Sequence, residues 1–404
     1  MERAVTTTTA DGARTTVAPG APPHQATIHA LTGLRFFAAL LVFFSHFPEL
    51  IPIDGAAVAL ERQGAAGVTI FFVLSGFVLT YRYGDTFQRS PAGMSTFVRA
   101  RLARIAPMNA VALIVTTVVI FLVSTTSSLL SWVLNLFMLQ SLVPTKEMNS
   151  WNIPAWSVSA ELVFYLVFPF FICLVLSRTR QRHLAALAAV LFAVEVVLFC
   201  AVAVLVERRM TGAGKAQVDI ESALSHAKFF PGLRIWEFFL GCVVGTAFVA
   251  MRADHGGLAW LRRLDGQRVR NGCLLVAALA LGTILLLPSL VDEPTSGLAA
   301  QLMSPGLYLA YTPIAVLLVA ALAWGPTIVS PVLEHRWART LGDSSYSFYL
   351  LQWAVLLVVL ESGWTPHPRV WWFSALALLV LLATSVVTAR LIEEPARRFV
   401  RGRH

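Results

Sequence analysis

LTGLRFFAALLVFFSHF, residues 31–47, is almost entirely apolar apart from one arginine and one histidine. As a helix rising 1.5 Å per residue, this stretch extends about 25 Å, close to the roughly 30 Å hydrocarbon core of a bilayer. Comparable apolar stretches recur along the chain. They predict ten membrane-spanning helices, near 34–51, 65–83, 106–125, 158–177, 184–206, 229–250, 272–290, 305–324, 341–360 and 370–391.

The composition agrees with a membrane protein. Of the 404 residues, 57% are hydrophobic and 13% are charged, and this charged share is about half of that in soluble domains. So few charges would not cover the surface of a soluble globule of this size, which excludes an ordinary cytosolic enzyme and a disordered chain. The fold class we expect is all-α, a polytopic protein embedded in the lipid bilayer.

Residues 127–143 form a further apolar segment that is ambiguous as a span. If this segment does not cross, the loops on one side carry 19 Lys and Arg and those on the other carry 7, as the positive-inside rule expects. If it crosses, the basic loop 177–183 moves to the outer side. We therefore expect a re-entrant or interfacial segment, with both termini cytoplasmic. The net charge of +9 then faces anionic lipid, and we expect no nucleic-acid partner.

The first span carries Arg35 and His46. A charged side chain in a span costs several kcal/mol unless it faces protein or water, so each such residue is a candidate for function. Eleven positions correspond to about 1100° of rotation and about 16 Å of rise, which puts both residues on one helix face. Arg35 could instead snorkel to the headgroups, and His46 could be structural. An anion-binding cation beside an imidazole suits a bound ligand and general-base catalysis.

Two other pairs of ionisable residues are spaced by three positions. Arg101 and Arg104 share a helix face at the cytoplasmic boundary. They are either a positive-inside anchor or a phosphate clamp, because guanidinium groups bind phosphate through two parallel hydrogen bonds. Arg234 and Glu237 lie within a span, where a structural ion pair and an active role both remain open.

Acidic residues mark two more places. Glu161 follows Trp156 at the entrance to a span and has no evident local partner, which favours a functional role. Glu393 and Glu394 lie near the end of the chain, where we expect Pro395 to stop the helix and leave a cytoplasmic anchor.

In order along the chain, from about residue 28 to 399, these motifs resemble those of the membrane acyltransferase 3 family. The set is the Arg-x10-His of the first span, IFFVLSGFVLT (70–80), RLARIAP (101–107), AWSVSAELVFYLVFP (155–169), RIWEFFLG (234–241), SYSFYLLQW (345–353) and EEPARR (393–398). Each motif alone is weak, but the ordered set is specific. The resemblance predicts an acyltransferase 3 transmembrane domain at 28–399, in a bacterial inner membrane. Residues 1–27 are rich in Thr, Ala and Pro and have no apolar core, so we expect a disordered cytoplasmic tail there, and residues 400–404 are a basic cytoplasmic end.

The resemblance implies transfer of an acyl group, commonly acetyl, from acyl-CoA to a hydroxyl of a sugar, glycan or macrolide-type natural product. Acyl-CoA would be a co-substrate, and no permanently bound cofactor or metal is implied. The matching positions give His46 as the essential histidine and Glu161 as the acid of a Trp-Ser-x-x-x-Glu motif. The acyl-CoA-binding arginines are Arg35, Arg101 and Arg104, and the supporting residues are Trp156, Ser157, Arg234 and Glu237. Gln352 stands where many members have histidine.

A mechanism consistent with these residues has the arginines hold the acyl-CoA phosphates. A pantetheine arm of roughly 15 to 20 Å then spans the rise from Arg35 to His46. His46 takes the proton of the acceptor hydroxyl, and Glu161 orients His46. The alternative is a secondary transporter of a metabolite, which ten spans with buried charged residues would also suit. A sensor or structural membrane protein is a third possibility.

Overall fold

The computed structural model describes residues 28–47, 56–122, 128–143, 145, 151–253, 266–290, 297–361 and 371–401, and every regular element within these ranges is helical. The long helices are α1 (His29–His46), α2 (Ala56–Phe87), α3 (Met94–Leu122), α5 (Trp156–Leu174), α6 (Leu184–Gly212), α8 (Pro231–Arg252), α9 (Gln267–Leu290), α10 (Gly297–Ala323), α13 (Ser345–Glu361) and α14 (Trp371–Thr388). The shorter ones are α4 (Leu129–Leu136), α7 (Gln217–Ala227), α11 (Ser330–Leu333), α12 (Arg336–Asp343) and α15 (Glu394–Arg401). The tail expected at 1–27 lies outside the described residues, as do residues 402–404.

Each predicted span overlaps one of these long helices. Among the described residues, seven helices are long and apolar enough to cross a membrane, and Leu309–Ala323 and Ser345–Val359 are shorter apolar helices. The prediction of an all-helical polytopic membrane protein is confirmed. α1 ends at His46, and residues 48–51 of the first predicted span lie outside the described residues.

The ambiguous segment 127–143 does not form a spanning helix. It contains α4, eight residues long, which rises only about 12 Å, and a single 3₁₀ turn at Gln140–Leu142. α4 packs on α3 through two hydrogen bonds, from Asn109 Nδ2 to the Asn135 carbonyl and from Trp132 Nε1 to Thr117 Oγ1, both 2.9 Å long. α4 is therefore too short to cross a bilayer, in agreement with the re-entrant or interfacial segment that the charge asymmetry predicted.

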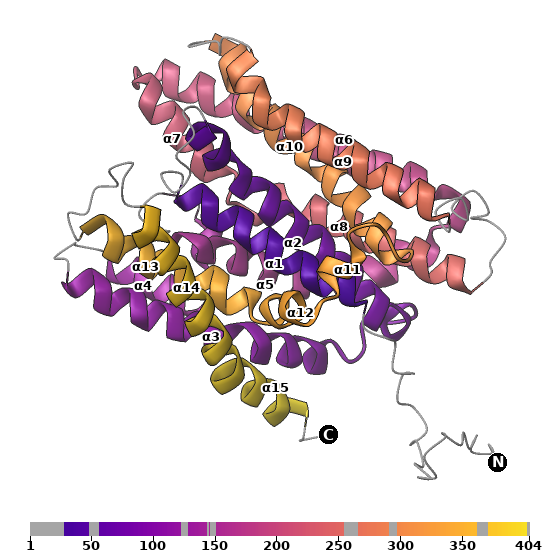
Figure 1. Cartoon of the computed structure of the whole chain (residues 1–404). Coiled ribbons are helices and arrows are strands. Elements are labelled where there is room, and N and C mark those ends of the chain that lie inside the picture. Colours follow the sequence, from indigo (N-terminus) through magenta and orange to yellow (C-terminus); the bar gives the residue numbers. More distant parts are fainter. Residues whose placement is uncertain are drawn as a thin grey trace.

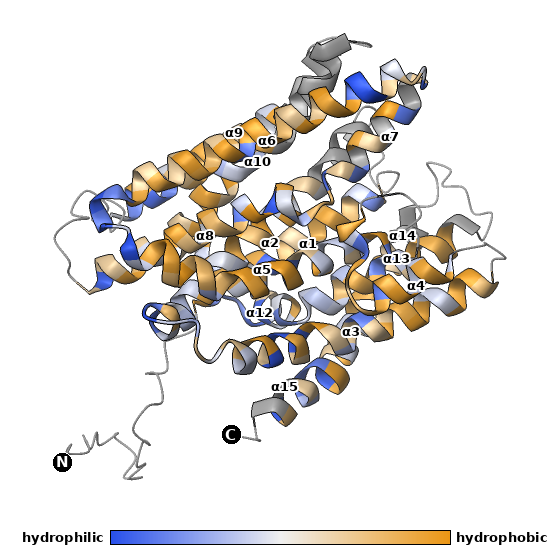
Figure 2. Cartoon of the chain, turned by 180° about the vertical axis from the view of Figure 1, so that it is seen from behind, coloured by the Kyte–Doolittle hydropathy of each residue, from blue (hydrophilic) through white to orange (hydrophobic). Residues whose placement is uncertain are grey.

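The helices form three groups across the molecule (Figure 1). α1, α2, α5 and α8 make the centre, α6, α9 and α10 lie along one side, and α3, α13 and α14 lie on the other. Apolar residues extend along the outer helices (Figure 2). Exposed side chains there include Val197, Leu279 and Leu379, as expected for surfaces that face lipid acyl chains.

Glycines bring α2 and α8 into backbone contact. A Cβ added to Gly76 of α2 would lie 2.0 Å from the Phe238 carbonyl oxygen, and one added to Gly241 of α8 would lie 2.0 Å from that of Val73. Small residues allow such close approach of membrane helices, whose association depends on packing. The contact fixes the charged residues of α8 against α2.

The start of α1 and the connection after α10 lie at the same end of the bundle. A Cβ added to Gly33 of α1 would lie 2.1 Å from the Leu333 carbonyl oxygen of α11. One added to Gly342 of α12 would lie 2.0 Å from the Thr32 carbonyl oxygen. The first turn of α1 is thus a neighbour of α11 and α12.

The expectation that Pro395 stops the last helix is wrong. A π-helical turn (Ala389–Glu393) continues directly from α14 into α15, which begins at Glu394. Pro395 follows directly after this π-helical turn, which already interrupts the regular i→i−4 hydrogen bonding that a proline would break. Glu393 is 1% exposed and accepts a hydrogen bond from Ser347 Oγ of α13. It is therefore a buried packing residue, not a surface anchor.

Candidate active site

One cavity lies between α1, α2, α3, α5 and α13. Its volume is about 70 Å³, and one water needs about 10–15 Å³ on the same measure, so the cavity accommodates a few waters or a narrow ligand chain. Along α2 the lining runs from Val68 to Leu79, which is about 16 Å. The polar lining consists of Arg35, Ser75, Arg101, Arg104, Ser157, Glu161, Tyr165, Ser345, Tyr346 and Tyr349.

Three of these lining residues are the arginines that the sequence indicated as phosphate ligands. Arg35 comes from α1, and Arg101 and Arg104 come from successive turns of α3. Arg101 is 9% exposed and donates from Nη2 to Tyr83 Oη at 2.9 Å. Its guanidinium carbon also lies 5.2 Å from the centre of the Tyr83 ring, within cation–π range. The fold therefore concentrates positive charge from two distant helices on one enclosed space.

Glu161 lies in the same cavity, and the expectation that it has no local partner is wrong. Its Oε1 accepts from Tyr165 Oη at 2.5 Å, one turn further along α5, and from Ser75 Oγ of α2 at 3.2 Å. Ser157 also lines the cavity, with its hydroxyl donating to the Pro154 carbonyl at 3.1 Å. Glu161 therefore lines the same cavity as the arginines, and hydrogen bonds from α2 and α5 hold its carboxylate in place.

His46 lies outside the lining of this cavity. It is the last residue of α1, where its ring is 6.0 Å from that of Trp353 and beside the Gln352 amide, both on α13. Glu161 instead accepts hydrogen bonds from Ser75 and Tyr165, so the structure does not support the expected role of Glu161 in orienting His46.

The cavity nevertheless ends close to the level of His46. A Cβ added to Gly64 of α2 would lie 2.1 Å from Ser45 Oγ, so Gly64 packs on α1 beside the residue that precedes His46. Val68, the first lining residue of α2, follows one turn later, about 6 Å along the helix.

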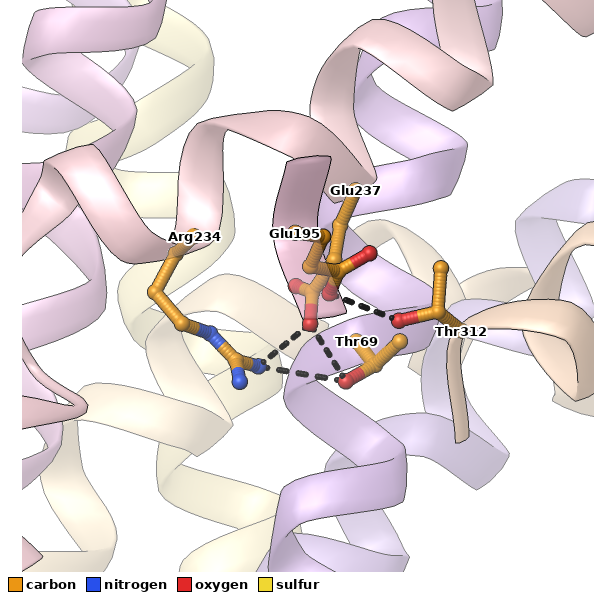
Figure 3. A network of polar contacts seen from close by, with 5 residues as sticks. All are labelled: Thr69, Glu195, Arg234, Glu237 and Thr312. Carbon is orange, nitrogen blue, oxygen red and sulfur yellow. Dashed lines mark hydrogen bonds and ion pairs between the residues drawn. The ribbon is translucent and has the colours of Figure 1, made fainter. Parts of the chain in front are cut away.

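Arg234 and Glu237 form the ion pair that their spacing allowed (Figure 3). Arg234 Nη2 lies 3.0 Å from Glu237 Oε1, and both side chains are 0% exposed. Thr69 of α2 connects them, because its Oγ1 accepts from Arg234 Nη2 at 3.1 Å and donates to Glu237 Oε1 at 3.2 Å. Trp156 packs beside this pair, with its ring 5.9 Å from the Arg234 guanidinium carbon and 5.9 Å from the Phe72 ring that lines the cavity. The pair thus supports the cavity wall from behind.

A second acidic residue belongs to this network, and our sequence reasoning missed it. Glu195 of α6 is 1% exposed and accepts from Thr312 Oγ1 of α10 at 2.9 Å (Figure 3). It is the single charged residue in the apolar run 184–206, and that isolation was the signal that could have identified it.

Comparison with known proteins identifies the family. Residues 28–390 match a family model described as an acyltransferase domain. The chain belongs to the acyltransferase 3 family. It is 30% identical to "Acyltransferase MdmB" of Streptomyces mycarofaciens, with 94% of each chain aligned. It is 24% identical to "Putative peptidoglycan O-acetyltransferase YrhL" of Bacillus subtilis (strain 168), over 93% of this chain and 55% of that protein. No solved structure matches the chain significantly.

Family membership decides between the alternatives that the sequence left open. The protein is an O-acyltransferase built on apolar helices suited to a bilayer, so the enzyme prediction is confirmed and the transporter is not supported.

Proposed function

We propose that the protein transfers an acyl group, acetyl in the simplest case, from acyl-CoA to a hydroxyl of a sugar, glycan or macrolide-type natural product. The observation that carries this proposal is the cavity lined by Arg35, Arg101 and Arg104. Three guanidinium groups enclosed together match the phosphates of coenzyme A in charge and hydrogen-bonding geometry. The enzyme would act in the bacterial inner membrane with both termini in the cytoplasm, the side from which acyl-CoA arrives.

The cavity dimensions fit the donor. With its phosphates at the arginines, the pantetheine arm follows the lining along α2 from Leu79 to Val68, about 16 Å. The thioester then lies about one helical turn from the level of His46, the distance that Gly64 and Val68 define. The cavity is narrow, so it favours the extended pantetheine chain over the bulky nucleotide of coenzyme A. The nucleotide would remain at the arginine end.

His46 acts as the general base in this proposal. It removes the proton from the acceptor hydroxyl while that oxygen attacks the thioester carbonyl carbon, and the resulting tetrahedral intermediate collapses with cleavage of the carbon–sulfur bond. The CoA thiolate that leaves then accepts this proton from the imidazolium of His46, which gives the acyl ester and free CoA. Base assistance of this kind typically contributes about 10²- to 10⁴-fold to the rate.

Glu161 has a different role from the one expected from sequence. Hydrogen bonds from Tyr165 and Ser75 hold its carboxylate beside the arginines. There it offsets part of their mutual repulsion and orients them when the donor is absent, so we assign it as a positioning residue of the donor site. Trp156, Arg234 and Glu237 support the same wall from behind.

Thermal stabilisation by CoA and acetyl-CoA tests the donor site. Ligand binding to the folded protein raises its melting temperature by mass action. The detergent-purified wild type should be stabilised saturably, and the Arg101→Ala/Arg104→Ala double variant should lose that response. Arg99→Ala is the matched control, because Arg99 is exposed on the same helix. No stabilisation of folded wild type at millimolar ligand would refute the proposal.

A second test isolates His46. His46→Gln should retain stabilisation by acetyl-CoA and lose acyl transfer by about 10²-fold or more, the contribution of a general base. Full transfer activity in this variant would exclude His46 as the general base without contradicting the proposed donor site.

A further inference from the structure

Three polar side chains meet where α1 ends, apart from the arginine cavity. His46 lies beside Gln352 and edge-to-face with Trp353, at a 6.0 Å ring separation. Four of their atoms are buried without a hydrogen-bond partner: His46 Nδ1, Gln352 Oε1, Gln352 Nε2 and Trp353 Nε1. Native proteins pair the large majority of their buried polar atoms with protein or water, so four such atoms on adjacent side chains require an explanation.

Gln352 differs from the comparable buried amides of the described chain. Asn135, Gln140 and Asn152 each have an unpartnered oxygen, but each donates its NH₂ group to a backbone carbonyl. Gln352 is 0% exposed, has no such bond to a backbone carbonyl, and has the His46 ring as its polar neighbour. One contact with His46 leaves most of the hydrogen-bonding capacity of the amide unused, which costs free energy in a buried position and is expected of a site preorganised for a ligand.

We infer that Gln352 and Trp353 form the acceptor subsite and hold the reacting hydroxyl group beside His46. This inference rests on the proposed function. An amide offers one acceptor oxygen and two donor hydrogens, so it can bind two neighbouring hydroxyls, each of which both donates and accepts. The indole N–H adds a third donor. The ring of Trp353 also presents an apolar face to the carbon skeleton of a glycosyl unit.

The chemistry of the subsite defines the class of acceptor. Gln352 and Trp353 carry no charge, and His46 must be neutral to act as a base. A carboxylate or phosphate next to the reacting hydroxyl would find no cation among these three side chains. The subsite therefore selects an uncharged polyhydroxyl group, such as the neutral sugar of a glycan or glycosylated natural product.

Steady-state kinetics with a detergent-purified full chain test the inference. Acetyl-CoA is the donor, release of the CoA thiol is the readout, and methyl β-D-glucopyranoside, N-acetylmuramic acid and erythromycin are offered in turn as acceptors. For the acceptor used best, Gln352→Ala and Trp353→Phe should each raise the acceptor KM, by about tenfold for Gln352→Ala. The KM for acetyl-CoA and the stabilisation by acetyl-CoA should not change.

Gln140→Ala is the matched control, because Gln140 is also a 0% exposed amide but is bonded to the Ala155 carbonyl. It should lower stability without changing the acceptor KM. If Gln352→Ala does not fold, Gln352→Glu and Trp353→Phe are judged by the same criterion.

Three results would overturn the inference. A fall in kcat at constant acceptor KM would show that Gln352 positions His46 instead of binding the acceptor, and unchanged kinetics would show no role in either. Failure of the wild type to acetylate any of the three acceptors would contradict the proposed function itself, which is a separate outcome. Preferred use of the anionic N-acetylmuramic acid would contradict the selection for an uncharged group.

Discussion

Arg234→Met should destabilise the protein strongly although Arg234 is not among the lining residues of the candidate active-site cavity. The variant leaves Glu237, 0% exposed, without the guanidinium that lies 3.0 Å away. At an effective dielectric constant of about 20, two unit charges at that distance attract by about 5–6 kcal/mol. Removing one partner of a buried ion pair typically costs about 3–5 kcal/mol. We expect a loss in that range in the free energy of unfolding.

The double variant Arg234→Met/Glu237→Met should recover much of this loss. Replacing both members of a buried pair by apolar residues is often neutral, because both desolvation penalties disappear with the attraction. The free energies are measured by denaturant titration in detergent micelles, followed by tryptophan fluorescence. Arg398→Met is the control, since Arg398 forms an ion pair with Glu394 at 3.2 Å but the two side chains are 82% and 50% exposed.

The control should lose less than about 1 kcal/mol, as exposed pairs do. The reasoning fails if Arg234→Met lies within about 1 kcal/mol of wild type, or if the double variant is as unstable as the single one. The first result would mean that the Glu237 carboxyl takes up a proton when Arg234 is removed, so that no unpaired charge stays buried. The second would mean that packing of the side chains, and not charge pairing, stabilises this part of α8.

Two further predictions concern packing and the donor site. Gly241→Ala should lower the free energy of unfolding by about 1–3 kcal/mol, because its Cβ would lie 2.0 Å from a backbone oxygen. Gly272→Ala, with nothing within 4 Å of the new Cβ, should be neutral or stabilise by up to about 1 kcal/mol in the same titration. Tyr165→Phe removes the 2.5 Å hydrogen bond to Glu161 and should raise the KM for acetyl-CoA without changing the acceptor KM. An unchanged KM for acetyl-CoA would separate Glu161 from donor binding.

The sequence predicts the helices better than the polar contacts between them. Apolar runs long enough to cross a bilayer give every long helix, because hydrophobic length is a local property. Pro395 shows where a local rule fails, since the chain continues through a π-helical turn into α15 instead of ending before the proline. The two hydrogen bonds of Glu161 show which contacts can be predicted from sequence and which cannot. Its bond to Tyr165 follows from four-residue spacing on one helix, whereas its bond to Ser75 joins residues 86 positions apart.

The arginines illustrate a choice that residue spacing leaves open and to which the three-dimensional structure adds an argument. A basic residue at the end of a span is equally well explained by the positive-inside rule, and nothing in the spacing of Arg101 and Arg104 separates that explanation from ligand binding. An anchor for lipid headgroups has to face outward. Arg101 is 9% exposed and lines the same cavity as Arg35, which comes from another helix. Three arginines converge there on one carboxylate, that of Glu161, and the cost of burying the excess positive charge favours binding of an anion over anchoring.

The two ends of the proposed reaction path are fixed on one rigid element. Arg35 and His46 belong to the same unbroken helix, so the about 16 Å between them changes only if α1 itself deforms. Gly64 sets the register of α2 against the end of α1, and α2 lines the cavity between the two levels. The donor site and the base are thus held at a constant separation, and the remaining variable is the acceptor. On this reasoning, differences between family members in what they acylate should arise at α13, around Gln352 and Trp353, and not at the arginines.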